Sequence, residues 1–107
     1  MSSPSLTVVL DRVHYRVILP DFVRLDLRVL ADRFLELETF AVRREKKGRV
    51  AELDLRQELV ELHAGDNNLE MTIRRGKPLE FAAAITGLTP AELMDARIEK
   101  LEVVFRD

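Results

Sequence analysis

The stretch from Phe40 to Arg56, FAVRREKKGRVAELDLR, constrains the fold more than any other part of the chain. Apolar residues alternate with polar ones on both sides of Gly48, which is the pattern of two strands joined by a tight turn. A glycine at the tip adopts a positive φ at little cost. The stretch therefore predicts a β-hairpin, around which the rest of the chain is organised.

The same hairpin holds the densest group of positive charges in the sequence. Six of the 17 Lys and Arg residues lie in it, namely Arg43, Arg44, Lys46, Lys47, Arg49 and Arg56. The acidic residues Glu45, Glu52 and Asp54 lie among them and weaken the positive field. This cluster is the only stretch that suggests a binding function.

The segments before the hairpin predict a strand and a helix. Residues 12–19, RVHYRVIL, alternate between apolar and polar and indicate a half-buried strand that ends at Pro20. Residues 26–37 carry apolar side chains at helical spacing, with Asp26 placed to cap the first turn. We therefore expect a strand followed by a helix.

The segments after the hairpin predict a second hairpin, two helical pieces and a last strand. Residues 58–63 and 69–75 are predicted to form strands around the turn Gly65-Asp66-Asn67-Asn68, with a helical turn as the alternative for residues 56–61. Pro78 opens a helix that ends at Gly87, and Thr89-Pro90-Ala91-Glu92 predicts the start of another short helix that ends near Ala96. Residues 97–105, RIEKLEVVF, complete the chain as a strand.

This order predicts an α+β fold. We expect a ferredoxin-like βαββαβ plan with an extra hairpin in a mostly antiparallel sheet, with the helices on one face and the first and last strands in the centre. A chain of 107 residues predicts a single domain over 1–107, with residues 1–5 as a flexible lead-in.

Composition excludes several kinds of site. The chain has no cysteine, which removes disulfides, thiolate metal sites and iron–sulfur ligation and is consistent with a cytoplasmic location. We see neither a signal peptide nor an apolar run long enough to span a membrane. The net charge of -2 argues against a dedicated nucleic-acid binder but leaves room for a local basic patch.

The sequence shows no catalytic constellation. His14 and His63 are interpreted as surface residues, because no third metal ligand accompanies either of them at a suitable spacing. The four glycines are scattered and form no phosphate-binding loop. We therefore predict no catalytic residue, no metal and no cofactor. The sequence favours a binding domain over an enzyme for the chain on its own.

The basic hairpin leaves two interpretations open. It can lie along the phosphates of RNA, with Phe40 and Tyr15 as the nearest aromatics for base stacking, or it is a solvated edge whose lysines prevent aggregation. Asp54 is interpreted as a partner in a salt bridge or as a helix cap. The candidate binding residues are Arg43, Arg44, Lys46, Lys47, Arg49, Asp54 and Arg56, and the basic segment 74–77 extends the patch if it lies alongside.

Four segments resemble a known family. SLTVVLDRVHYRVILP, VRREKKGRVAELDLR, NLEMTIRRG and GLTPAELMDARIEK resemble the C-terminal half of the radical SAM-linked protein family, a bacterial domain of unknown function associated with radical SAM proteins. The resemblance implies an accessory role beside a radical SAM protein, in chemistry that acts on RNA. The N-terminal half of that family, with its own motifs, has no counterpart here.

The leading hypothesis is therefore a non-catalytic accessory domain that binds RNA through the basic hairpin. One alternative is a protein–protein interaction module that docks to a radical SAM partner or to itself through a sheet edge. The other is half of an enzyme whose catalytic residues lie in the missing N-terminal half.

Overall fold

The main sheet has four strands and is antiparallel throughout. The computed structural model describes residues 9–106, except for the side chains of Val9, Lys46 and Arg106. The predicted lead-in, residues 1–5, lies outside the described residues. The strands follow the order β4-β5-β1-β6, with bounds β1 Val9–Ile18, β4 Leu59–Ala64, β5 Asn68–Ile73 and β6 Arg97–Arg106.

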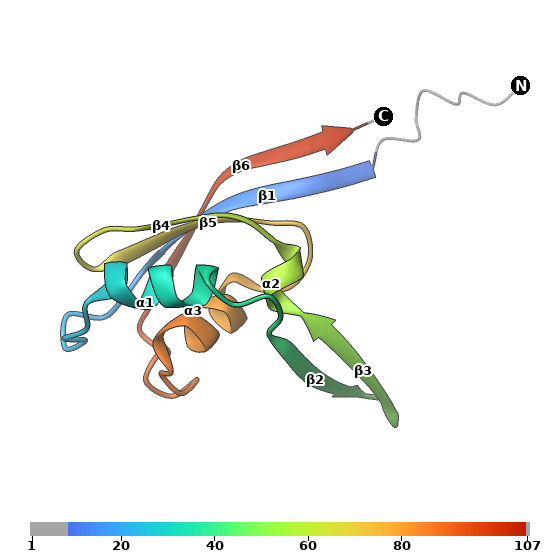
Figure 1. Ribbon diagram of the computed structural model, residues 1–107, viewed down its shortest axis with the longest axis horizontal. Coiled ribbons are helices and arrows are strands. Elements are labelled where there is room, and N and C mark those ends of the chain that lie inside the picture. Colours follow the sequence, from blue (N-terminus) through green and yellow to red (C-terminus); the bar gives the residue numbers. More distant parts are fainter. Residues whose placement is uncertain (1–8, 107) are drawn as a thin grey trace, which may run out of the picture.

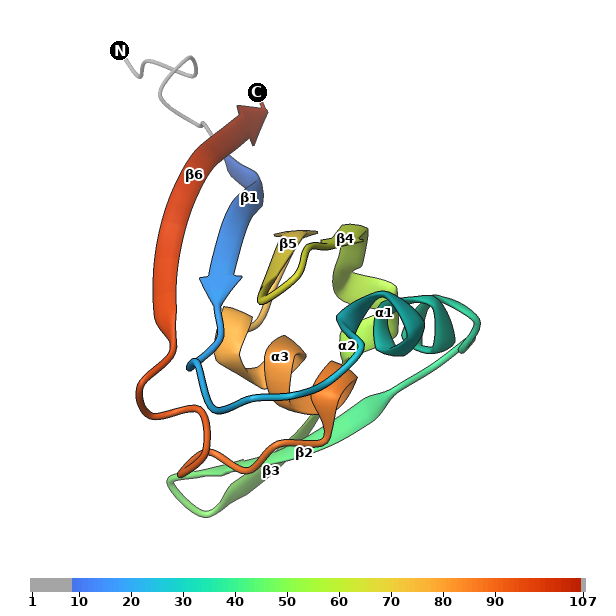
Figure 2. The same cartoon turned by 90° about the vertical axis from the view of Figure 1, so that its left-hand side faces the viewer.

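Two helices cover one face of this sheet. Figures 1 and 2 show α1 (Leu27–Leu35) and α3 (Pro78–Thr86) on the same side of the four strands. The predicted ferredoxin-like plan is confirmed. The extra hairpin, β2 (Ala41–Lys46) and β3 (Arg49–Asp54), forms a separate two-stranded sheet instead of joining the main one.

The predicted position of the last strand is wrong. β1 and β5 are the central strands, and β6 lies at one edge of the sheet, paired with β1 alone. The central position was expected as part of the fold plan, for a strand rich in residues that favour β-structure. The structure instead leaves many of its apolar side chains exposed, because the β4–β5 hairpin takes the other side of β1.

Local signals explain where the helices begin. The Asp26 side chain accepts a hydrogen bond from the Val29 N–H and caps α1, as predicted. The segment after the basic hairpin contains both predicted structures, since a four-residue helix, α2 (Leu55–Glu58), precedes β4. α3 ends at Gly87, whose φ of 78° is in the left-handed region.

The second short helix, predicted over residues 89–96, is wrong. The capping box itself forms, because Glu92 N–H donates to Thr89 Oγ1 and Thr89 N–H donates to the Glu92 carboxylate. Only one backbone bond of helical spacing follows, from Leu93 N–H to the Thr89 carbonyl, and the next bonds span three residues. The segment is a series of turns, anchored in the core by Leu93.

The core lies between the helices and the covered face of the sheet. The alternation in β1 places Val13 and Val17 on this side, and both are buried. Phe81 of α3 and Met71 of β5 are fully buried in the same cluster. The alternating apolar residues of the strands and the apolar residues at helical spacing thus supply the two sides of the core.

Candidate functional site

The basic hairpin projects from the body of the molecule as a two-stranded ribbon, here called the ribbon and defined as residues 41–54 (Figure 1). Lys46 pairs with Arg49, so the connecting loop consists of Lys47 and Gly48 alone. Both have a positive φ, 52° for Lys47 and 76° for Gly48. Such a two-residue loop matches the twist of the strands, and the turn predicted at Gly48 is confirmed.

The base of the ribbon is fixed to the body by apolar contacts and by one ion pair. Val42 and Leu53 oppose each other and pack against the core. Two residues further along, Arg44 donates from both Nε and Nη2 to the two carboxylate oxygens of Glu80 in the first turn of α3. A forked Arg–carboxylate pair fixes orientation as well as position.

The other ribbon cations whose side chains the structure describes face solvent. Arg43, Lys47 and Arg49 are exposed, and the side chain of Lys46 lies outside the described part of the chain. Arg43 stands opposite Glu52 across the strands, whereas Lys47 occupies the tip. Among the ribbon cations with described side chains, Arg44 is thus the one already held by a carboxylate within the protein.

The basic segment 74–77, between β5 and α3, lies beside the ribbon. A hollow of about 210 Å³ is lined on one side by Arg44, Glu52 and Leu53 and on the other by Arg75 and Gly76. A neighbouring hollow of about 430 Å³ brings Lys77 next to Arg44. The condition for extending the basic patch is therefore met, although Arg75 also contacts Glu58 at 3.4 Å.

The side chain of Asp54 accepts two backbone hydrogen bonds at the base of the ribbon. Its Oδ1 accepts from Phe40 N–H at 2.9 Å and from Gln57 N–H at 3.2 Å. The first bond ties the start of β2 to the end of β3, and the second caps α2. Of the two interpretations left open by the sequence, the helix cap is the one observed.

Arg56 lies apart from the exposed cations of the ribbon. It belongs to α2 and donates from Nη2 to the Leu35 carbonyl at 3.3 Å. Its Nε is buried and has no hydrogen-bond partner among the described residues. Together with the buried Leu55 and the cap at Asp54, it forms a joint between α1 and the ribbon.

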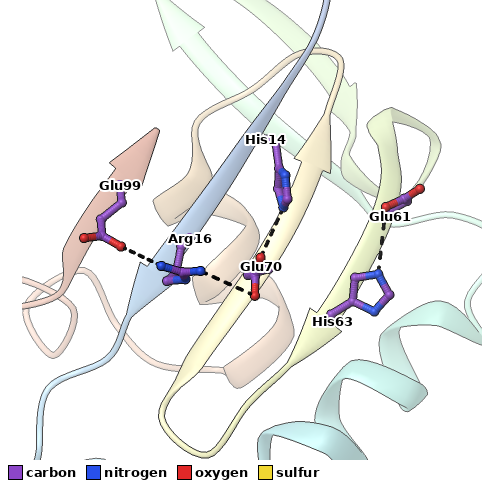
Figure 3. Close-up of polar contacts among 6 residues, drawn as sticks. All are labelled: His14, Arg16, Glu61, His63, Glu70 and Glu99. Carbon is purple, nitrogen blue, oxygen red and sulfur yellow. Dashed lines mark hydrogen bonds and ion pairs between the residues drawn. The ribbon is translucent and has the colours of Figure 1, made fainter. Parts of the chain in front are cut away.

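The open face of the sheet carries a row of ion pairs that spacing alone did not predict (Figure 3). Arg16 of β1 contacts Glu99 of β6 at 3.1 Å and Glu70 of β5 at 3.9 Å. His14 Nε2 lies 3.4 Å from the other oxygen of Glu70. The row follows from the register, since Arg16 stands opposite both glutamates.

His63 lies one strand away, in β4, with its Nε2 3.8 Å from Glu61 (Figure 3). Residues 9–106 contain no group of three or more His, Asp or Glu side chains arranged to hold a metal ion. Within this row Arg16 contacts two glutamates, and each histidine lies beside a glutamate. The one guanidinium of the row is therefore already held by carboxylates within the protein.

Glu92, which lies outside both the ribbon and the open face of the sheet, has a lowered pKa. The backbone N–H and the hydroxyl of Thr89 donate to Glu92, and these bonds hold the pKa of Glu92 below its ordinary value. The carboxyl is at the surface, so the shift reflects its cap role and marks no cleft.

Comparison with family models, curated proteins and solved structures found no match for this chain. Among the helices of residues 9–106, none is long and apolar enough to cross a membrane.

Proposed function

We propose that the chain is a non-catalytic binding domain that contacts the phosphates of double-helical RNA with the ribbon and the adjoining segment 74–77. The charge distribution carries the proposal. These two segments hold eight Lys and Arg against three Asp and Glu, and the rest of the chain holds nine against 16. A protein of net charge -2 thus has one strongly basic projection, which favours an anionic partner there.

The tip of the ribbon supports the same proposal. Lys47 holds a left-handed conformation that asparagine or glycine adopts at lower cost in this type of turn. Backbone strain of this kind occurs preferentially at functional positions. Lysine, unlike asparagine, places a positive charge at the outermost point of the ribbon.

The absence of aromatic residues from the ribbon sequence favours phosphate contacts over base stacking. Residues 41–54 contain no Phe, Tyr or Trp. Phe40, at the base, packs against Phe34 with 5.5 Å between ring centroids, and Tyr15 is half-buried against the core. Single-stranded RNA is usually bound by stacking bases on aromatic side chains, so a duplex fits this surface better.

The test is RNA binding measured against salt concentration. A blunt-ended RNA duplex of mixed sequence is titrated with the wild type and with a variant carrying Arg43→Ser, Lys47→Ser and Arg49→Ser. Arg44 is kept because it holds the ribbon on α3. Each lost phosphate contact lowers the salt slope by about one, so we expect a loss of roughly two to three in slope.

A matched control separates local from total charge. Arg24, Arg28 and Arg33 are exposed on and before α1, and replacing all three by serine changes the net charge by the same amount. This control is expected to retain the wild-type slope. The proposal fails if the wild type binds no duplex at low salt, if both variants lose binding equally, or if single-stranded RNA of the same sequence binds more tightly.

An accessory role beside a radical SAM protein stays a prediction that rests on the sequence resemblance. Asp54-Leu55-Arg56, which ends the most specific of the resembling segments, forms the joint at the base of the ribbon. Binding of the purified chain to a purified radical SAM protein is the direct measurement.

A further inference from the structure

The outer edge of β6 is long and apolar for the edge strand of a sheet. β6 spans ten residues, and among the described residues no strand pairs with its outer side. Its exposed fractions are 43% for Ile98, 40% for Leu101, 36% for Val103 and 59% for Phe105. A row of unpaired backbone N–H and C=O groups flanked by apolar side chains favours pairing with another strand.

The opposite edge of the sheet lacks this character. β4 has six residues, and its exposed side chains include Glu61 and His63. The outer halves of β1 and β6 also run beyond the helix layer, so helices do not cover that end of the sheet (Figure 1). The uncovered apolar surface thus belongs to β6 and its neighbour β1, where Leu10 is 48% exposed.

The register shows which face these side chains occupy. Ile98 stands opposite the buried Val17, and Val103 opposite the buried Val13, so both point to the helix side. Phe105 is two residues further along the strand and points the same way. The outer strand therefore has an apolar stripe along one face, interrupted by Lys100, which stands opposite Tyr15 on the same face, and by the bulge at Leu101.

We propose that β6 pairs antiparallel with β6 of a second copy, giving a continuous eight-stranded sheet. A two-fold axis perpendicular to the sheet leaves the helices of both copies on the same face of the continuous sheet. In the two registers that overlap most of the strand, Ile98 of one copy then faces Val103 or Phe105 of the other. The stripe is therefore complementary to itself.

Charge is compatible with a second copy as the occupant. β6 carries Arg97, Lys100 and Arg106 against Glu99 and Glu102, so its net charge is only +1 and repels a second copy weakly. Glu99 is in addition neutralised by Arg16 of its own chain. A strongly charged partner gains little from so small a net charge, whereas a copy gains the same apolar contacts twice.

The oligomeric state tests the proposal directly. Sedimentation of the wild type over a range of concentrations is expected to show a monomer–dimer equilibrium. The double variant Ile98→Lys and Phe105→Lys places two charges on the stripe and is expected to be monomeric. Val29→Lys and Leu37→Lys, which also replace exposed apolar residues, are the matched control and are expected to retain the dimer. Circular dichroism verifies that both variants are folded.

Cross-linking distinguishes this dimer from any other. The chain has no cysteine, so a variant with Ile98→Cys and Phe105→Cys has only those two thiols. Within one copy they lie on the order of 20 Å apart along the strand, too far for a disulfide. Oxidation is expected to give a covalent dimer with this pair or with Ile98→Cys and Val103→Cys. A wild type that stays monomeric up to its solubility limit, or a dimer that neither the lysine variant nor the cysteine pairs affect, overturns the proposal.

Discussion

The carboxylate of Asp54 accepts a hydrogen bond from the backbone N–H of Phe40, with 2.9 Å between Oδ1 and the nitrogen. The same oxygen accepts from Gln57 N–H at 3.2 Å. One side chain thus holds the two ends of the ribbon together and starts the helix that follows. The basic surface is thus presented by a joint in which Asp54 and Arg56 both form hydrogen bonds within the protein.

Replacing Asp54 by alanine is expected to destabilise the fold by about 2 kcal/mol, because the α2 cap is lost and the partly buried Phe40 N–H is left without its partner. Asp54→Asn keeps the accepting oxygen and is expected to cost less than half as much. Urea unfolding of both variants measures the difference. Equal losses for alanine and asparagine would show that the negative charge, and not the accepted hydrogen bonds, matters.

The ion pair between Arg44 and Glu80 is expected to couple the ribbon to α3. A double-mutant cycle with Arg44→Ala and Glu80→Ala is expected to give a coupling energy of about 0.5–1 kcal/mol, since the pair is forked but partly exposed. Glu80→Ala alone is expected to cost more than Arg44→Ala alone, because Glu80 also accepts from Lys77 N–H at 3.0 Å. Urea unfolding of the four proteins supplies the cycle, and a coupling energy near zero would show that the apolar contacts alone hold the ribbon.

Sequence patterns predicted the elements whose signals are local. The alternation in β1, the Asp26 cap and the Lys47-Gly48 turn each involve neighbours in the chain, and each is present in the structure. The capping box at Thr89 is equally local and forms, yet the expected helix does not. A cap lowers the cost of starting a helix but does not supply the further turns that stabilise it.

Strand order and ion pairing could not be predicted from patterns within single segments. The residues of β6 do not reveal whether another strand pairs with its outer side, because strand order depends on segments far away in the chain. Likewise Arg44 and Glu80 are 36 residues apart, and only the packing of the ribbon on α3 brings them together. The basic cluster was therefore predictable as a cluster, whereas the subset of its cations that remains free was not.

The low pKa of Glu92 gives a pH dependence with a definite sign. A carboxyl whose pKa is lower in the folded than in the unfolded protein stabilises the fold above its unfolded pKa, and this contribution is lost as the pH falls through the folded pKa. Thr89→Val removes the hydroxyl bond but keeps the backbone one, so we expect the pKa of Glu92 to rise part of the way to its ordinary value. Side-chain NMR titration measures it, with Thr39→Val as the control that leaves this pKa unchanged.

The conformation of Lys47 links stability to the proposed RNA contact. Lys47→Asn is expected to stabilise the fold by about 0.5–1 kcal/mol, because asparagine tolerates a left-handed backbone better than lysine. The same change removes the tip cation and is expected to lower the salt slope of duplex RNA binding by about one. Lys47→Gln is the matched control, since it removes the charge without relieving the backbone and is expected to weaken binding with no gain in stability. If both variants bind RNA as tightly as the wild type at low salt, the tip of the ribbon does not contact phosphate, and the strain at Lys47 has another origin.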